Sequence, residues 1–183
     1  MIPFPDKKYN IIYADPPWSY QAWKKDAKGA AGLAEHHYDT MSIEEICNLP
    51  VKDIADKQCV LFMWVTYPQL QDSMKVIESW GFKYKTVAFT WVKRNKNNKE
   101  YCKSLGYWTK SNAEICLLAT KGTANKLVID RSVGQIIDSI RERHSKKPDE
   151  ARERIVQLLG DIPRIELFAR ETADGWDSWG NEI

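Results

Sequence analysis

Four consecutive residues, Asp15, Pro16, Pro17 and Trp18, could together bind a small planar amine. An exocyclic amine of a nucleobase is a poor nucleophile because its lone pair is delocalised into the ring, so a catalyst must hold both amine hydrogens. The Asp15 carboxylate can accept one N–H, and the Pro16 carbonyl can accept the other. Pro17 restricts Pro16 and holds that carbonyl in place. The Trp18 ring offers a face on which a base can stack.

The same residues also allow a purely structural interpretation, a turn that ends a strand. The apolar run from Tyr9 to Ala14 predicts a buried strand, and prolines end it because proline has a fixed φ and no N–H group. A turn explains the prolines but neither the acidic residue nor the tryptophan. We therefore interpret Asp15 to Trp18 as a catalytic corner.

Strand and helix patterns alternate along the chain. Apolar runs rich in β-branched and aromatic residues predict strands at residues 9–14, 59–65, 85–92, 114–119 and 164–168. Helical spacing of apolar residues, with capping and stop signals, predicts helices at 42–47, 68–80 and 148–159. The alternation predicts an α/β domain with a mostly parallel sheet and helices on both faces. Ligands bind at the carboxyl ends of strands in such folds, which is where the catalytic corner lies.

Length and composition indicate one ordinary globular domain, residues 1–183. The chain has 43% apolar and 28% charged residues, which is not the composition of a disordered protein, and it has no apolar run long enough to predict a membrane span. The first residues lack the features of a secretory signal, so we expect a cytoplasmic protein. The four cysteines contain no C-x-x-C pair, so we expect neither a zinc site nor a disulfide framework.

A basic segment from Lys93 to Lys103 contains five basic residues and the single acidic residue Glu100. Such a run is usually a solvated surface, but beside a base-modifying corner it could equally contact phosphates, with Tyr101 and Tyr107 available for stacking. The net charge of +2 is compatible with a nucleic-acid partner without demanding one. Both interpretations of the basic segment stay open at the level of the sequence.

Six further motifs follow the catalytic corner. They are L-F-M-W-V-T at 61–66, W-G-F at 80–82, W-V-K at 91–93, G-Y-W-T-K-S-N-A-E at 106–114, K-K-P-D-E at 146–150 and I-E-L-F-A-R at 165–170. With A-D-P-P-W after a short strand, this ordered series resembles the N6-adenine methyltransferases of the family of the mRNA adenosine methyltransferase catalytic subunit, including its small bacterial and phage members. The resemblance covers nearly the whole chain.

The resemblance implies a Rossmann-like methyltransferase fold with a permuted order, in which the catalytic motif precedes the cofactor motif. It implies transfer of a methyl group from S-adenosylmethionine to N6 of an adenine in nucleic acid, for which we expect DNA rather than RNA. Because N6 is paired inside a duplex, the target base must be flipped out or single-stranded. We expect a monomer or homodimer, and the resemblance is also compatible with a partner subunit.

The resemblance assigns cofactor contacts to residues in both halves of the chain. Asp15 would hold the target amine and lie close to the methionine amino group of the cofactor. Lys147 would contact the methionyl portion, with the lysine before it as the alternative. Arg170 and Asn181 match positions that hydrogen-bond the cofactor ribose, and Glu182 stands where a glutamine is common.

The substrate contacts that the resemblance implies lie elsewhere. Tyr38 matches a tyrosine on a loop that closes on substrate, and Glu114 matches an acidic residue near the target base. Lys93 of the W-V-K motif and the Trp18 ring complete the expected substrate site. The two histidines before Tyr38 would point apart in an extended chain, and this methyl transfer needs no metal, so we expect no metal site.

Two alternatives keep the nucleic-acid partner but differ in function. A non-catalytic partner subunit would support an active homologue, although such partners typically lose the acidic corner and Asp15 is intact. An N4-cytosine methyltransferase also uses an acceptor followed by two prolines and an aromatic residue. The chain departs from the family in the short stretch E-T-A-D-G between Arg170 and Trp176, which leaves adenosine recognition in that turn unassigned.

Overall fold

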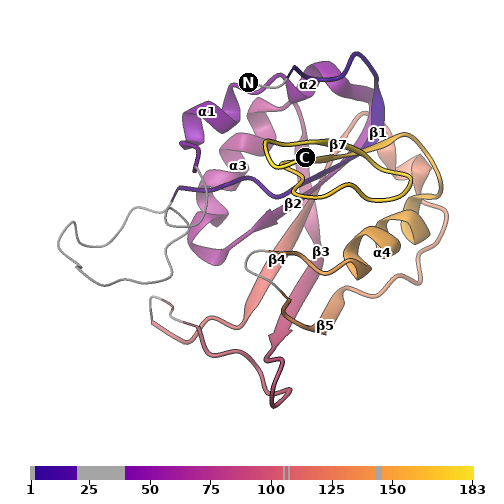
Figure 1. Ribbon diagram of the computed structural model, residues 1–183. Coiled ribbons are helices and arrows are strands. Elements are labelled where there is room, and N and C mark those ends of the chain that lie inside the picture. The colour runs from indigo at the N-terminus through magenta and orange to yellow at the C-terminus, as the bar shows by residue number, and fades with distance from the viewer. Residues whose placement is uncertain (1–2, 20–39, 105, 107, 143–145) are drawn as a thin grey trace.

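A computed structural model describes residues 3–19, 40–104, 106, 108–142 and 146–183. These residues form a seven-stranded sheet with the strand order β5-β3-β4-β2-β1-β6-β7 (Figure 1). The strands are β1 (Tyr9–Ala14), β2 (Ala55–Val65), β3 (Lys83–Arg94), β4 (Ala113–Lys121), β5 (Ile136–Ile140), β6 (Arg164–Leu167) and β7 (Asp177–Trp179). Because β1 lies inside the sheet, between β2 and β6, the catalytic corner that follows it is flanked by strands on both sides.

Six of the seven strands run in the same direction. The strand β1 pairs in parallel with β2 and β6, β6 with β7, and β3 with β5, whereas β4 is antiparallel to both β2 and β3. The prediction of a mostly parallel sheet is therefore confirmed. Because β4 is reversed, its first residues lie at the edge where the other strands have their carboxyl ends.

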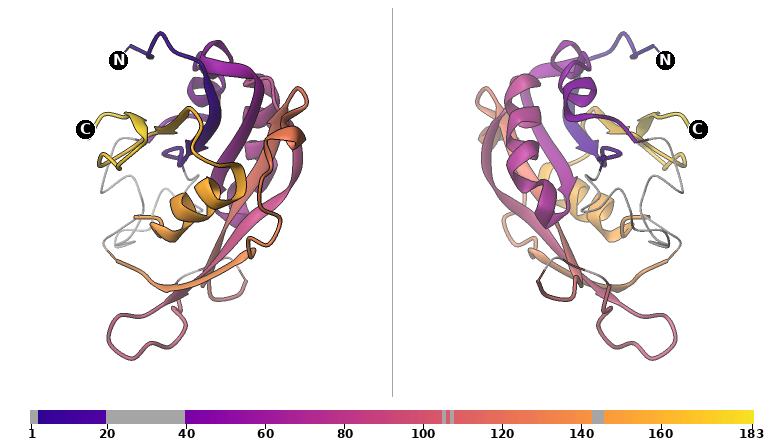
Figure 2. Two further views of the ribbon diagram at one scale, coloured as in Figure 1. Left: turned by 90° about the vertical axis from the view of Figure 1, so that its right-hand side faces the viewer. Right: turned by 90° about the vertical axis from the view of Figure 1, so that its left-hand side faces the viewer.

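Helices cover both faces of the sheet (Figure 2). On one face, α1 (Ile43–Cys47), α2 (Val51–Ile54) and α3 (Leu70–Ser79) pack in a core that includes Ile12 and Ala14 of β1. On the other face, α4 (Glu150–Leu159) packs in a core that includes Ile11 and Tyr13 of the same strand. Burial on both faces is the reason that the central strands are continuous apolar runs, as predicted. Of the helices described, none has the length and apolar character that crossing a membrane requires.

The predicted helix ends are confirmed. Ser42 caps α1 through a capping box with Glu45, α3 ends just before Gly81, and α4 ends at Gly160. The sequence patterns missed α2, β5, β7 and two 3₁₀ turns, Tyr67–Gln69 and Ala124–Leu127. Each of these elements has at most five residues, which is too short for a periodic pattern to show.

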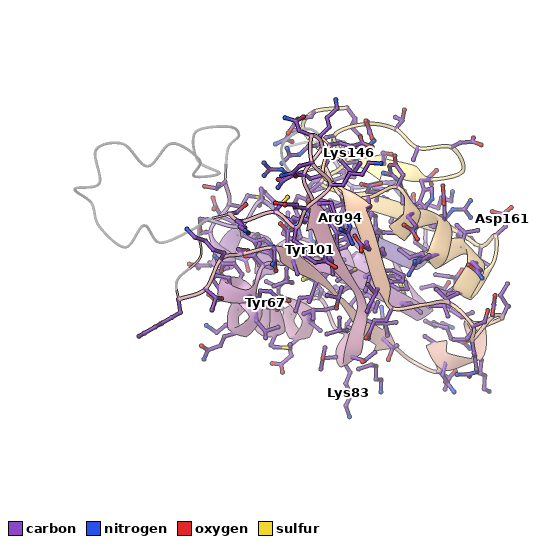
Figure 3. The ribbon with its side chains drawn as sticks, turned by 90° about the horizontal axis from the view of Figure 1, so that it is seen from below. Tyr67, Lys83, Arg94, Tyr101, Lys146 and Asp161 are labelled. Atoms are coloured by element: carbon purple, nitrogen blue, oxygen red, sulfur yellow. The ribbon has the colours of Figure 1, made fainter. Side chains whose placement is uncertain are left out.

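The carboxyl edge of the parallel strands collects segments that are far apart in the sequence. The catalytic corner follows β1, the basic segment begins at the end of β3, and Glu114 lies at the start of the reversed strand β4. Figure 3 views the molecule from this side, with Arg94 and Tyr101 of the basic segment near the centre of the view. Topology alone therefore brings three of the predicted site segments to one edge.

The pairing of β6 with β7 depends on the close approach of Gly180 to Ala169. A Cβ atom at Gly180 would lie 2.2 Å from the Ala169 carbonyl oxygen. We therefore expect Gly180→Ala to lower the free energy of unfolding by about 1 to 3 kcal/mol, the usual cost of overpacking. Urea unfolding measures the loss.

The control for this substitution is Gly134→Ala. A Cβ atom there would meet Arg154 at 3.5 Å, an ordinary van der Waals contact, so we expect a change within about 0.5 kcal/mol. Equal losses in the two variants would show that the approach of Gly180 to Ala169 does not limit the pairing.

Candidate active site

Four charged side chains form a row of alternating sign at the carboxyl edge. The Lys147 Nζ donates a hydrogen bond to Asp15 Oδ2 at 2.6 Å and lies 3.4 Å from Glu114 Oε2. The Lys93 Nζ donates to the other oxygen of Glu114. The row thus contains two carboxylates and two ammonium groups, each next to a group of opposite charge, and all four are mostly buried.

Strand register brings these groups together. Ala14, the residue before Asp15, pairs with Met63 of β2 and Leu167 of β6. On the other side of β2, Glu114 pairs with Trp91, two residues before Lys93. Lys147 comes from the segment just before α4, on the face of the sheet that α4 covers. The sheet therefore supplies three of the four charges, and the segment before α4 supplies the fourth.

Two tryptophans on the α4 face of the sheet lie next to this row of charges. The Lys147 Nζ lies 5.9 Å from the Trp64 ring centroid and the Lys93 Nζ 4.8 Å from that of Trp91. The two rings meet edge to face with centroids 6.3 Å apart. Trp64 Nε1 donates to the Tyr13 hydroxyl at 2.6 Å, so its indole has a fixed orientation. The aromatic rings exclude water from beneath the charges, which strengthens the attraction between them.

Burial and charge shift the pKa values of the two carboxyls in opposite directions. Burial raises the pKa of Asp15; Lys147 opposes this rise and Glu114 adds to it, so the pKa stays above its ordinary value. Burial alone would also raise the pKa of Glu114, but the ammonium groups of Lys147 and Lys93 together hold it below its ordinary value. The same surroundings therefore disfavour the ionised form of Asp15 and favour that of Glu114.

Adjacent lysines before α4 enter different networks. Lys147 contacts Asp15, whereas the Lys146 Nζ donates to Asp149 at 2.9 Å and lies 3.1 Å from Glu142. The structure therefore places Lys147, and not Lys146, against the catalytic corner. Sequence alone had left this choice open.

A second ion pair fixes the position of α4. Arg152, in the first turn of α4, donates to Glu166 of β6 at 2.7 Å. Burial raises the pKa of Glu166 and Arg152 opposes the rise, so the pair is held in a poorly solvated position between helix and sheet. This contact ties the start of α4 to β6. Because Lys147 lies just before α4, the same contact supports its position over Asp15.

The residues predicted to hold a ribose gather at the ends of β6 and β7. Arg170 Nε lies 3.5 Å from Glu182 Oε1, and the exposed Asn181 precedes Glu182. Phe168 has a φ of 62°, a strained conformation for a residue with a side chain, and its ring packs against Trp179 with centroids 5.5 Å apart. This turn after β6 brings the Arg170 charge close enough to lower the pKa of Asp15.

The structure corrects the role predicted for Trp18. Its side chain is only 4% exposed, lies in the core on the α1 and α3 face of the sheet, and donates through Nε1 to the Trp64 carbonyl at 3.2 Å. A ring buried in this way has no free face on which a base can stack. The backbone of the corner explains the difference, because the Trp18 N–H bonds the Pro16 carbonyl at 2.8 Å and the chain turns back toward the sheet.

Part of the basic segment has internal partners. Lys93 pairs with Glu114, and Arg94 donates to both oxygens of Asp138 at 2.6 Å each. The Arg94 guanidinium also lies 4.4 Å from the Tyr101 ring centroid. These two cations hold the ends of β3, β4 and β5 together. The remaining lysines of the segment are exposed, and they are Lys96, Lys99 and Lys103.

The predicted substrate residue Tyr38 and the expectation about a metal site remain to be placed. Tyr38 and the two histidines before it lie outside the described residues. Within the described ranges, no three His, Cys, Asp or Glu side chains are placed to hold a metal ion.

The sequence interpretation missed the site roles of Trp64 and Trp91 and the pair between Arg152 and Glu166. Alternation along β2 places Trp64 on the same face as Phe62, but only the register of β1 and β2 sets this face beside Tyr13. No sequence signal paired Arg152 with Glu166.

Comparison with known proteins identifies the family. A family model described as MT-A70 matches residues 9–182, nearly the whole chain. The chain belongs to the MT-A70 family. The resemblance drawn from the sequence motifs is thereby confirmed, and the mixed α/β fold is of the Rossmann-like methyltransferase type. The permuted motif order stays a prediction.

Individual relatives of this MT-A70 chain are named as methyltransferases. The Type II methyltransferase M.MunI of Mycoplasma sp is 38% identical over 98% of this chain and 79% of its own length. The putative N(6)-adenosine-methyltransferase MT-A70-like of Medicago truncatula is 31% identical over 96% of this chain and 26% of its own length. The N(6)-adenosine-methyltransferase MT-A70-like of Arabidopsis thaliana is 28% identical over 96% of this chain and 24% of its own length. The chain thus spans about a quarter of these plant relatives.

The adjacent lysines allow a matched test of the charge row. Lys147→Met removes a positive charge that lowers the pKa of Asp15 and of Glu114. We therefore expect both carboxyl pKa values to rise, as measured by carbon-13 NMR titration of the labelled side chains. Lys146→Met removes the same charge one residue earlier and should leave both values unchanged. Equal shifts in the two variants would contradict the assigned geometry.

Proposed function

We propose that this MT-A70 chain is an S-adenosylmethionine-dependent enzyme that methylates N6 of adenine in DNA. The observation that carries the proposal is the buried Asp15–Lys147 ion pair at the end of β1, beside a carbonyl that a turn holds in place. The names of the relatives support the reaction, and M.MunI, which this chain matches over most of both lengths, supports DNA over RNA. We further propose that the chain acts as one domain, residues 1–183, as a monomer or homodimer in the cytoplasm.

The charge row fits the cofactor that the family implies. S-adenosylmethionine supplies an electrophilic methyl group and carries an amino acid end with one ammonium and one carboxylate. Asp15 and Lys147, which are 2.6 Å apart, offer the complementary charges. A buried charge that loses its partner is strongly destabilising, and a zwitterion would give each of these side chains a new one. Arg170, Asn181 and Glu182 combine guanidinium, amide and carboxylate groups that suit ribose hydroxyls.

The catalytic corner fits an exocyclic amine. Asp15 Oδ2 bonds Lys147, and a carboxylate has further lone pairs for an amine N–H. The Pro16 carbonyl accepts the Trp18 N–H at 2.8 Å and keeps a second lone pair for the other amine hydrogen. Pro17 is the central residue of this three-residue turn, and its fixed φ suits the geometry. Two acceptors held in place draw the amine nitrogen toward the tetrahedral geometry that it has when it attacks.

Product analysis tests the proposal. The protein is incubated with labelled S-adenosylmethionine and with DNA or RNA, and the modified nucleosides are identified. We expect N6-methyladenine in DNA, and we expect Asp15→Ala to reduce its formation by about 100-fold or more because an acceptor of the reacting amine is lost. N4-methylcytosine would establish the alternative reaction. Unchanged methylation by Asp15→Ala in an assembled complex would make the chain a partner subunit.

The acid limb of the pH profile tests the role of Asp15. Methylation needs the Asp15 carboxylate, so the rate should fall as the pH drops through a pKa that lies above the ordinary value for Asp. Glu114→Gln removes a negative charge that raises this pKa, so the acid limb should move to lower pH in single-turnover measurements. Glu100→Gln, which removes a carboxylate from the exposed part of the basic segment, should leave the limb in place. A limb that is the same in all three proteins would exclude Asp15 as its source.

A further inference from the structure

Trp108 is almost fully exposed at the carboxyl edge of the sheet. Its side chain is 96% exposed, on a turn whose base is closed by two backbone hydrogen bonds of 3.0 Å between Ser104 and Ser111. Gly106 of the same turn approaches the Thr109 carbonyl so closely that a Cβ atom would lie 2.1 Å from it. Backbone hydrogen bonds thus hold the base of the turn, yet Trp108 exposes a large apolar side chain to solvent.

Exposed aromatic rings gather at this edge. Among the described residues, the strongly exposed aromatic side chains are Trp108, Tyr67 (52%), Tyr101 (48%) and Tyr84 (39%). Tyr67 follows β2, and Tyr101 and Trp108 lie between β3 and β4, so these three are at the carboxyl edge. Tyr84 lies at the start of β3, at the opposite edge. The asymmetry places exposed rings on the side of the molecule that holds the charge row.

Exposed lysines lie in the same segment of the chain, between β3 and β4, as Tyr101 and Trp108. Lys96, Lys99, Lys103 and Lys110 are exposed, and Glu100 is the one acidic residue in the sequence from 93 to 112. Within the described part of the chain, no carboxylate lies within ion-pair distance of these four ammonium groups. Rings interleaved with cations match a nucleic acid, whose bases stack and whose phosphates attract positive charge. An apolar protein partner would match the rings alone.

The sequence bounds the distance from Trp108 to the charge row. Trp108 precedes Glu114 by six residues, and an extended chain spans at most about 3.6 Å per residue, so the two backbones lie within roughly 20 Å. Bases along one strand are about 3.4 Å apart. The backbone of Trp108 therefore lies within about six base spacings of Glu114, the second carboxylate of the charge row.

We propose that Trp108 stacks on another base of the nucleic-acid strand that carries the target adenine. This inference rests on the proposed function, because the target base defines the position of the strand. Removing a base from a duplex costs a few kcal/mol, and stacking on an aromatic side chain returns a comparable amount. Trp108 thereby takes the stacking role that the buried Trp18 cannot perform, but toward another base of the strand rather than toward the target.

Affinity for labelled duplex and single-stranded DNA, measured by fluorescence anisotropy with S-adenosylhomocysteine present, tests this inference. We expect Trp108→Ala to bind roughly 5- to 100-fold more weakly, the range of one lost stacking contact, and Trp108→Phe to retain most of the affinity. Tyr84→Ala is the control at the opposite edge and should bind like the unmodified protein. Because the Trp108 side chain is exposed, we do not expect its replacement to impair folding, and thermal unfolding of the variant checks this.

The salt dependence separates stacking from charge. Trp108→Ala should lower the affinity at every salt concentration without changing the slope of log affinity against log salt. Lys110→Gln should reduce that slope by about one phosphate contact. A reduced slope in Trp108→Ala, or an affinity equal to that of the unmodified protein, would overturn the inference. A change in oligomeric state with unchanged DNA affinity would assign the ring to a protein interface and would overturn it as well.

The outcomes distinguish this inference from the proposed function. Methylation of adenine N6 without a dependence of DNA affinity on Trp108 would leave the proposed function standing and refute the stacking role. A dependence of DNA affinity on Trp108 without N6-methyladenine as product would support the stacking role and refute the proposed reaction.

Discussion

The ion pair between Asp15 and Lys147 is the constraint on which the site depends. A carboxylate at the end of a central strand is expensive to bury, and it remains in place only because an ammonium group from a distant segment reaches it. That requirement fixes where the segment before α4 must lie. The pairing of Arg152 with Glu166 and the packing of α4 on the sheet then support the position of Lys147.

The charge row gives the two carboxylates different properties although they are neighbours. Glu114 has two ammonium groups beside it and stays ionised more readily than a free carboxyl. Asp15 has a like charge nearby and less compensation, so burial dominates its behaviour. A site built in this way holds one carboxyl whose ionised form is favoured and one whose ionised form is disfavoured by its surroundings. The same division suits a reaction in which one carboxylate positions ligands while the other contacts the reacting amine.

The two halves of the site meet because of backbone details at the β6 end of the sheet. Phe168 adopts a positive φ, and Gly180 allows the chain after β7 to pass directly over Ala169. The strain at Phe168 is offset by the packing of its ring against Trp179. These features bring Arg170 close to Asp15 and Glu182 close to Arg170, although both lie more than 150 residues beyond β1 in the sequence.

Much of the fold was determined by the sequence itself. Continuous apolar runs, helix caps and stop signals predicted the long strands and helices, and the motifs predicted the family, because these signals are local and depend on a few adjacent residues. The sequence also identified Asp15, Lys147 and Glu114 as separate candidates. Only the tertiary structure decided that Lys147 rather than Lys146 faces Asp15, and that Trp18 is buried while Trp64 lies under the charges. The physical reason is that strand register, the reversal of β4 and the direction of a turn decide which side chains meet, and none of these is encoded in adjacent residues alone.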